Sequence, residues 1–294
     1  MLCKLLWMVP GCLVMALAVA GADVSQDETY LLRYSFRPGE EHRGRVVHLV
    51  AVDTTIQGVT ETVKTRSVSV KNWQIQEADE SQITFLYRIE HVAMWHQVSG
   101  RPEVRYDSAR DAHAPPEYQQ VARTIGEPMA TITISATGRV LNRDSSLPQF
   151  NPGLGELTIP LPEEPVAVGH QWSTESDLPV RARPEDPIRR VKIRQVYTLE
   201  KVQTGVATIA VRSHLITPVN DPAIESQLVQ RLRRGYVKFD VDAGRLMSQQ
   251  MDTDEIVIGF NGPQSSMKYL SRLTEELHRD ETVASRSSAA ATVR

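Results

Sequence analysis

The stretches ISATGRVL at residues 134–141 and FDVDAGRL at residues 239–246 follow one pattern. In each, alternating apolar and polar residues lead into a turn of small residues that ends in Gly-Arg, and a second apolar segment follows. Glycine in a three-residue turn of this kind takes the left-handed conformation, which other residues adopt only with strain. The pattern therefore predicts two β-hairpins of similar design, far apart in the chain.

Alternation with a period of two continues along much of the sequence, most clearly at 31–37, 83–90, 190–199, 236–241 and 255–260. Such alternation is typical of antiparallel strands with one buried face and one solvent-exposed face. The residues expected on the buried face are Leu32, Tyr34 and Phe36; Ile83, Phe85, Tyr87 and Ile89; Val191, Ile193, Tyr197 and Leu199; Val237, Phe239 and Val241; and Ile256, Ile258 and Phe260. The segment 45–52 is apolar at nearly every position, which predicts a central strand covered on both faces.

Only two segments predict helices, 116–125 and 222–234. Pro116 and Pro222 suit the first helical position, and Asp221 is a natural N-cap. The glycines expected to end the two helices are Gly126 and Gly235.

Each predicted helix is followed by an alternating strand, a Gly-Arg turn and a further strand. We therefore predict a mainly β fold with a few helices (α+β), built as two similar antiparallel sheets or half-barrels, each covered by one helix. The predicted segments are a first β-rich repeat at 23–147, a Pro-rich connector at 148–166, a second repeat at 167–275 and a disordered tail at 276–294. The alternative is one continuous sheet in which similar turn chemistry produced similar hairpins.

The first 22 residues differ from the rest of the chain. Lys4 is their only charge, an apolar run extends from Leu5 to Ala20, and small residues precede Asp23. This composition is typical of a cleaved signal peptide, so we expect a periplasmic or secreted protein with no membrane span after cleavage. An uncleaved membrane anchor is the alternative, although the run is short for a span.

Both cysteines, Cys3 and Cys12, lie inside this predicted signal peptide. The mature chain is therefore expected to form no disulfide and to hold no Cys-ligated metal. The sequence VPGC at 9–12 also allows lipidation of Cys12 as an alternative. The net charge of −3, with basic and acidic residues interspersed, argues against a nucleic-acid partner.

The candidate chemical groups in the mature chain are few. His91 and His96 are too far out of phase on a strand to share a metal ion without a bulge, and the Asp240–Asp242 pair lacks a third ligand at a calcium-loop spacing. Asp242 is expected to hydrogen-bond the turn backbone. Asp252 and Asp254 form a second carboxylate pair. The basic runs 189–194 and 231–234 are expected to be solvated faces rather than an anion site, and Trp73, Trp95 and Trp172 are expected to be core residues rather than ligand platforms. We assign no catalytic, cofactor-binding or metal-ligating residue, and no cofactor.

The sequence contains no zinc-protease, nucleophile-elbow, P-loop or dinucleotide-binding motif. With its FRPGEEHRGRVV opening at 36–47, its Gly-Arg hairpins and its mature part without cysteine, the chain resembles exported bacterial β-rich proteins classed as domains of unknown function. The expected arrangement of sheet and covering helix is also similar to the half-barrels of lipoprotein carriers. These resemblances imply a location in the cell envelope and no particular activity.

The sequence favours an exported, non-catalytic envelope protein that binds an apolar ligand or a protein partner. Two alternatives remain open, namely a hydrolase with a site built from loops and a purely structural surface protein. A curved sheet with a helix across it would provide an apolar opening for a lipid or a peptide.

Overall fold

The computed structural model describes residues 28–145 and 158–278. Its strands are β1 (Thr29–Tyr30), β2 (Glu41–Ile56), β3 (Val59–Ala78), β4 (Gln82–Val98), β5 (Val104–Asp107), β6 (Pro128–Ser135), β7 (Val140–Ser145), β8 (Val166–Ala167), β9 (Gln171–Val180), β10 (Arg189–Gln203), β11 (Val206–Leu215), β12 (Arg234–Asp240), β13 (Arg245–Ile258) and β14 (Ser265–His278). The helical segments are the 3-10 helix η1 (Pro116–Tyr118), α1 (Gln119–Ala122), α2 (Pro222–Leu228) and the 3-10 helix η2 (Val229–Arg231).

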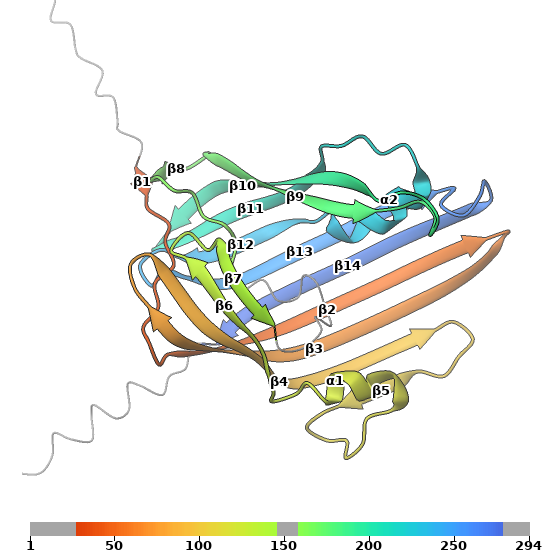
Figure 1. The fold of residues 1–294 in the computed structure, drawn as a ribbon, viewed down its shortest axis with the longest axis horizontal. Coiled ribbons are helices and arrows are strands. Elements are labelled where there is room, and N and C mark those ends of the chain that lie inside the picture. The colour runs from red at the N-terminus through yellow and green to blue at the C-terminus, as the bar shows by residue number, and fades with distance from the viewer. Residues whose placement is uncertain (1–27, 146–157, 279–294) are drawn as a thin grey trace, which may run out of the picture.

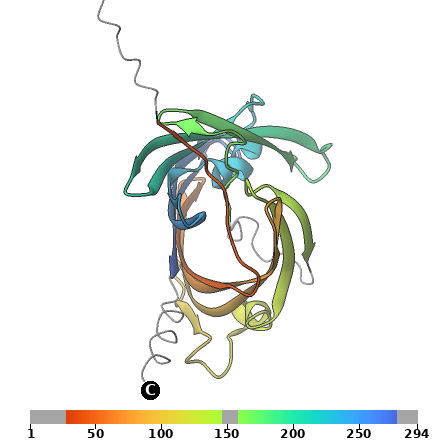
Figure 2. The same cartoon turned by 90° about the vertical axis from the view of Figure 1, so that its left-hand side faces the viewer.

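A twelve-stranded sheet contains most of these strands in the order β7-β6-β4-β3-β2-β14-β13-β12-β11-β10-β9, with β5 paired to β4 beside this path. The long strands β2, β3, β13 and β14 form its middle (Figure 1). The sheet curves strongly when it is viewed from one end (Figure 2). Separately, β1 and β8 form a two-stranded sheet. The predicted mainly β, antiparallel fold is therefore confirmed.

The finer prediction, two similar sheets each covered by one helix, is not confirmed. Strands from both predicted repeats belong to the twelve-stranded sheet, because β14 pairs with β2 along its whole length. Two separate sheets would leave the long edges of β2 and β14 without hydrogen-bond partners, and such edges are unfavourable in a folded protein. The observed arrangement is the continuous sheet that the sequence left as the alternative.

The helices are shorter than the sequence predicts. The predicted helix 116–125 is reduced to η1 and α1, and Gly126, with φ of +81°, follows it as expected. In the second helix Asp221 caps the N-terminus, because its side chain accepts a hydrogen bond from the N–H of Ala223 at 2.9 Å. Gly235 was expected to end this helix, and this expectation is wrong.

Gly235 lies inside β12, where it pairs with Met251 of β13. A Cβ atom at this position would overlap the carbonyl group of Gln250. The close approach of the two strands therefore explains why this position is glycine. The residues around Gly235 in the sequence do not indicate this contact.

The two Gly-Arg turns contact the same segment of the chain, residues 31–37, which we call the strap. The N–H of Tyr34 donates to the carbonyl of Ala136 at 2.8 Å beside the first turn. The N–H of Ser35 donates to the carbonyl of Gly244 at 2.9 Å in the second turn. The strap therefore crosses from the β6–β7 hairpin to the β12–β13 hairpin, and Figure 2 shows this N-terminal segment running across the end of the curved sheet.

The strap keeps the alternation predicted for it without forming a strand. Leu32 and Tyr34 are buried and Phe36 packs against the core, as expected from their common phase. The strap lies against the two turns instead of joining the twelve-stranded sheet. Its periodicity reflects one buried face, which an extended segment can have without sheet pairing.

A second crossing segment, residues 158–162, packs beside the strap. The hydroxyl of Tyr34 accepts from the N–H of Ile159 at 2.9 Å and donates to the carbonyl of the same residue at 3.2 Å. Leu161 N–H donates to the carbonyl of Thr137, and Trp172 Nε1 donates to the carbonyl of Pro160. Burial raises the pKa of Tyr34 far above its ordinary value, so its hydroxyl remains protonated and can serve both groups.

Tyr34→Phe should lower the free energy of unfolding by about 1–3 kcal/mol, because it leaves the buried backbone N–H and C=O of Ile159 without their partner. Chemical denaturation followed by tryptophan fluorescence measures this change. Tyr106→Phe is the matched control, because Tyr106 is also buried but its hydroxyl makes no hydrogen bond to a described residue. Equal effects of the two substitutions would contradict the assigned role of Tyr34.

The core lies on the inner face of the curved sheet. The predicted buried faces of β4, β10 and β12 are confirmed at these positions: Ile83, Phe85, Tyr87, Val191, Ile193, Tyr197, Leu199, Val237 and Phe239. The predicted phase of 255–260 is wrong, since Ile256 and Ile258 are 58% and 71% exposed and Val257 is buried. Val257 packs against Val229 of η2. Consecutive apolar residues do not indicate by themselves which side chains are buried, and here the contact with η2 decides it.

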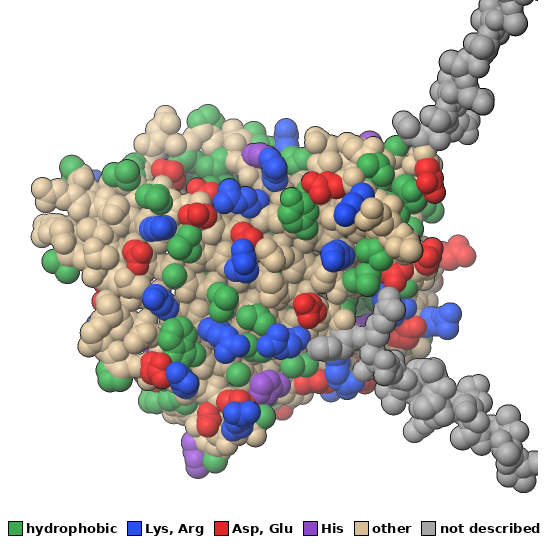
Figure 3. Space-filling model, turned by 180° about the vertical axis from the view of Figure 1, so that it is seen from behind, with side chains coloured by type: hydrophobic (Ala, Val, Ile, Leu, Met, Phe, Trp, Pro, Cys, Tyr) green, Lys and Arg blue, Asp and Glu red, His purple; other side chains and the backbone are tan. Residues whose placement is uncertain are grey.

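The strand at 45–52 lies near the middle of the sheet as part of β2, as predicted. It is not covered on both faces, because Leu49 is 42% exposed while Val46 is buried. Figure 3 shows the face opposite to the view of Figure 1, where acidic and basic side chains are interspersed. Arg272 and Asp252 form one outer ion pair, between neighbouring strands, at 2.7 Å.

Several sequence predictions fall partly or wholly beyond the described ranges. The signal peptide at 1–22, with Cys3 and Cys12, lies outside the described residues, and so does most of the connector at 148–166. β14 continues to His278, past the boundary at 275 predicted for the tail, and the remainder of 276–294 lies outside the described residues. Within 28–145 and 158–278, no helix has the length and apolar character needed to cross a bilayer.

Candidate functional site

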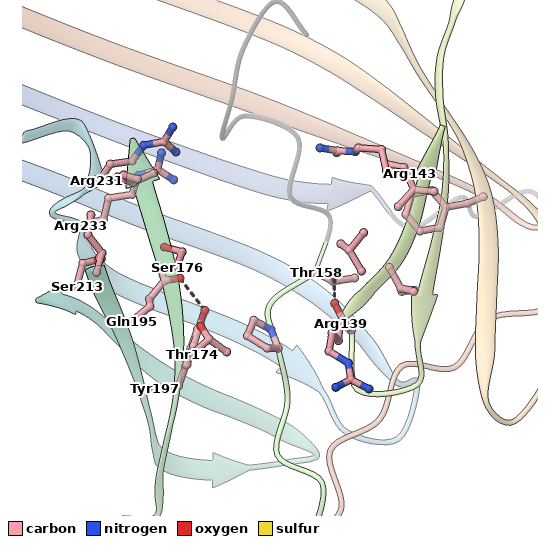
Figure 4. A pocket seen from close by; sticks show the side chains of 18 residues that line it. Arg139, Arg143, Thr158, Thr174, Ser176, Gln195, Tyr197, Ser213, Arg231 and Arg233 are labelled. Atoms are coloured by element: carbon pink, nitrogen blue, oxygen red, sulfur yellow. Dashed lines mark hydrogen bonds between the residues drawn. The ribbon is translucent and has the colours of Figure 1, made fainter. Parts of the chain in front are cut away.

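A cavity of about 360 Å³ lies between the two ends of the twelve-stranded sheet. One wall comes from β6 and β7, and the opposite wall comes from β9, β10 and β11 (Figure 4). The lining residues of the cavity are Phe85, Ile132, Ile134, Gly138, Arg139, Val140, Arg143, Thr158, Pro160, Thr174, Ser176, Leu178, Ile193, Gln195, Tyr197, Ser213, Arg231 and Arg233. The volume lies within the range of small-molecule sites, toward its lower end.

The cavity exists because the edge strands β7 and β9 do not pair with each other. At one end the crossing segment fills the space between them. It is hydrogen-bonded to the β6–β7 turn on one side and to Trp172 on the other. Thr158 Oγ1 donates to the carbonyl of Gly138 at 2.9 Å, and Trp172 stacks on Tyr197 with 5.7 Å between the ring centres. The crossing segment therefore forms a wall of the cavity through Thr158 and Pro160.

Apolar side chains form much of the cavity wall. Ile132 and Ile134 contribute from β6, and Leu178 and Ile193 contribute from β9 and β10. The strand period explains this arrangement, because alternate residues of each strand point to the same face. On β9 the alternate residues Thr174, Ser176 and Leu178 follow this rule.

Arginines supply the charged part of the lining, beside the uncharged polar side chains of Thr, Ser and Gln residues. Arg231 ends η2, Arg233 lies two residues further along the chain, and Arg143 lies on β7 at the opposite wall. Figure 4 shows the guanidinium groups of Arg231 and Arg233 directed toward the space from one side, and that of Arg143 directed toward it from the other. Arg139 also lines the cavity, but its guanidinium group points away from this group.

Positive charge dominates this lining, since none of the described residues that line the cavity is Asp or Glu. Within the described ranges, neither Arg143 nor Arg231 has a carboxylate within 4.0 Å. Arg233 donates from Nε to the carbonyl of Gln230 at 3.2 Å. Burial lowers the pKa of His48, and the positive charge of Arg233 lowers it further.

A buried ion pair lies on the inner face, formed by Lys71 of β3 and Glu275 of β14. The two side chains are 2% and 3% exposed, and their charged atoms are 3.6 Å apart. They reach each other across β2 at Gly44, where a Cβ atom would lie 3.4 Å from the Glu275 carboxylate. Gln249 donates to the same carboxylate at 2.7 Å. Burial raises the pKa of Tyr87, and the nearby charge of Glu275 raises it further.

His91 and His96 interact with different residues. His91 Nε2 lies 2.9 Å from Asp107 Oδ1, and His96 Nδ1 lies 2.9 Å from the hydroxyl of Tyr118. The His91 interaction holds the pKa of Asp107 below its ordinary value. Among the described residues, no group of three His, Cys, Asp or Glu side chains could hold a metal ion.

The aspartates also have structural partners. Asp240, not Asp242 as expected, accepts a hydrogen bond from the turn at the N–H of Ala243. The reason is geometric, because Asp240 is the last residue of β12 and the turn folds back onto it. Asp252 forms its ion pair with Arg272, so Asp252 and Asp254 do not act as an isolated carboxylate pair.

The tryptophans and the first basic run largely follow the prediction. Trp73 is fully buried and Trp172 packs against the core, while Trp95 is only partly buried and donates to Glu103. Arg194 and Lys192 of the run 189–194 form ion pairs with Glu175, as expected of a solvated face.

The second basic run departs from its prediction as a solvated face. Arg231 and Arg233 line the cavity. The helix predicted at 222–234 places these arginines at its C-terminal end, whereas the helical part ends at Arg231 and β12 begins at Arg234. The signal that could have found the site is a basic run placed directly before a buried alternating strand.

No protein-family model matches the chain, and no curated protein matches it. Solved structures that are similar in part include the following three. Lipovitellin, described for its lipid–protein interactions, is 11% identical with a TM-score of 0.41, over 83% of this chain and 26% of that chain. This chain therefore spans about a quarter of the length of that protein.

The other two structures are DynF from the dynemicin biosynthesis pathway of Micromonospora chersina and an outer membrane channel from Pseudomonas putida F1. DynF is 8% identical with a TM-score of 0.22, over 90% of this chain and 92% of that chain. The channel is 7% identical with a TM-score of 0.23, over 83% and 97%. Identities and scores this low carry no argument about function.

Proposed function

We propose that this chain is an exported, non-catalytic envelope protein that binds an apolar ligand in the cavity between the two ends of its sheet. Export is proposed from the composition of residues 1–22 alone. The observation that carries the binding proposal is the cavity of about 360 Å³, with apolar side chains contributed by both facing walls.

The construction of the cavity supports this proposal. Regular strands hold both walls, and the hydrogen bonds of the crossing segment fix one end. A site formed in advance in this way loses little conformational entropy when a ligand binds. Burial of the apolar part of a ligand against Ile134, Leu178 and Ile193 would supply the driving force.

Ser176→Trp should weaken binding of the uncharged fluorescent probe N-phenyl-1-naphthylamine by at least about tenfold, which corresponds to 1.4 kcal/mol. Ser176 lies on the edge strand β9 and lines the cavity, so an indole at this position would occupy the ligand volume. Probe fluorescence titrated against purified protein gives the dissociation constant, and denaturing mass spectrometry of the same sample detects a ligand that co-purifies.

Ser173→Trp is the matched control for this experiment. Ser173 belongs to the same strand, but it has the opposite parity to the lining residues and is exposed. The same substitution there should leave probe binding unchanged. Unaltered binding in the Ser176 variant, or no saturable binding by the parent protein, would refute the proposed site.

A further inference from the structure

We infer that the ligand is a single-chain amphiphile with an anionic head group, bound with its head between Arg143 and Arg231 and its chain along the apolar wall. This inference rests on the proposed function, since it assumes that the cavity binds an apolar ligand. It goes further by assigning the chemical class of that ligand and the residues that recognise it.

The first argument is the charge of the lining. Arginines on both walls line the cavity of about 360 Å³, and none of the described lining residues is acidic. The guanidinium groups of Arg143 and Arg231 point toward its space from opposite walls. Because positive charges gathered at a cleft attract anions, this lining favours a ligand with an anionic head group.

The second argument is the geometry of the two walls. Arg143 extends from β7, and Arg231 extends from the end of η2 on the other side of the cavity (Figure 4). These side chains come from segments far apart in sequence, and both point toward the same space. Guanidinium groups bind carboxylates and phosphates through two parallel N–H donors, so an anionic head group that enters this space finds such donors on both walls.

The third argument is the separation of polar and apolar lining. In Figure 4 the guanidinium groups of Arg143 and Arg231 extend from opposite walls into the upper part of the view, and Thr174 and Tyr197 lie lower down. Tyr197 donates its hydroxyl to Gln195 at 2.8 Å, which leaves its ring against the cavity and stacked on Trp172. A ligand with one charged end and one apolar end matches this division, whereas a uniformly apolar ligand leaves the guanidinium groups unmatched.

The test compares decanoate with decanol, which have the same chain and differ in the head group. Isothermal titration calorimetry of the full mature chain should show decanoate binding about tenfold more tightly than decanol, as expected for hydrogen bonds to a charged group. Decyl phosphate, included as a third ligand, identifies which anionic head group is preferred. Inorganic phosphate should not displace decanoate, because it lacks the apolar chain.

The variants Arg143→Gln and Arg231→Gln should each weaken decanoate binding about tenfold and leave decanol binding nearly unchanged. Arg190→Gln is the matched control. Arg190 is exposed on β10 with the opposite parity to the lining residues Ile193, Gln195 and Tyr197, so its removal changes the net charge equally and leaves the cavity intact. This control should leave the affinity for both ligands unchanged.

The outcomes separate this inference from the proposed function. Equal affinities for decanoate and decanol, or equal losses in the Arg190 control, would overturn the anionic head group and leave an apolar site in place. Displacement of decanoate by inorganic phosphate at similar concentration would overturn the amphiphile. Failure of both decanoate and decanol to bind would instead refute the proposed function itself.

Discussion

Gly138→Ala and Gly244→Ala should each destabilise the protein by about 1–3 kcal/mol beyond the ordinary cost of a side chain in the left-handed conformation, because each new methyl group would collide with the strap or the segment beside it. The two glycines have φ of +79° and +62°. A Cβ atom on Gly138 would lie 2.6 Å from the carbonyl oxygen of Ile159, and one on Gly244 would lie 2.8 Å from that of Arg33. Neither obstacle can move without displacing backbone.

Gly100→Ala separates the collision from the backbone strain. Gly100 has φ of +75°, close to that of Gly138, but a Cβ atom there meets nothing within 4 Å. It should therefore show only the strain, about 1–2 kcal/mol. Urea denaturation of the three variants measures the difference, and equal midpoints for all three would show that the turns do not hold the strap.

Lys71→Met should lower the free energy of unfolding by about 3–5 kcal/mol, because it leaves the carboxylate of Glu275 buried without its cation. Both side chains are almost completely buried, and within the described ranges Gln249 donates the one side-chain hydrogen bond that this carboxylate accepts. The pair lies over Gly44, which has no side chain that could replace the missing partner.

The double variant Lys71→Met, Glu275→Gln should recover most of this loss, because neither remaining side chain carries a charge and Gln249 can still donate to an amide oxygen. Arg194→Met provides the exposed comparison. Its pair with Glu175 lies on the outer face, and its loss should cost no more than about 1 kcal/mol. A double variant less stable than Lys71→Met would show that burial of the charge is not the cause.

The sequence by itself predicted the secondary structure well where the signal is local. Alternation identified the strands around Phe85, Tyr197 and Phe239 together with their buried faces. The two Gly-Arg turns were also predictable, because a positive φ is a property of the turn itself. These features depend on neighbours within a few residues, and periodicity and turn composition report such neighbours directly.

The candidate site was not predictable from the sequence in the same way. The run at 231–234 is visible in the sequence as a basic segment. Whether its side chains point into the cavity depends on where α2 and η2 end, and the opposite wall is supplied by β7, which carries Arg143. Nothing near Arg143 in the sequence indicates that it faces Arg231 across a cavity. Sequence patterns record the residue types, whereas the cavity arises from two sheet edges that do not pair.

The sequence therefore determined that this chain forms antiparallel strands with one buried face and two tight turns of similar design. Only the tertiary structure decided that both turns hold one strap, that Gly235 lies at a close contact between strands, and that Val257 is buried where Ile256 was expected to be. The physical reason is that backbone preferences act locally. Which face is covered, and which charges meet, depends on contacts between residues far apart in the chain.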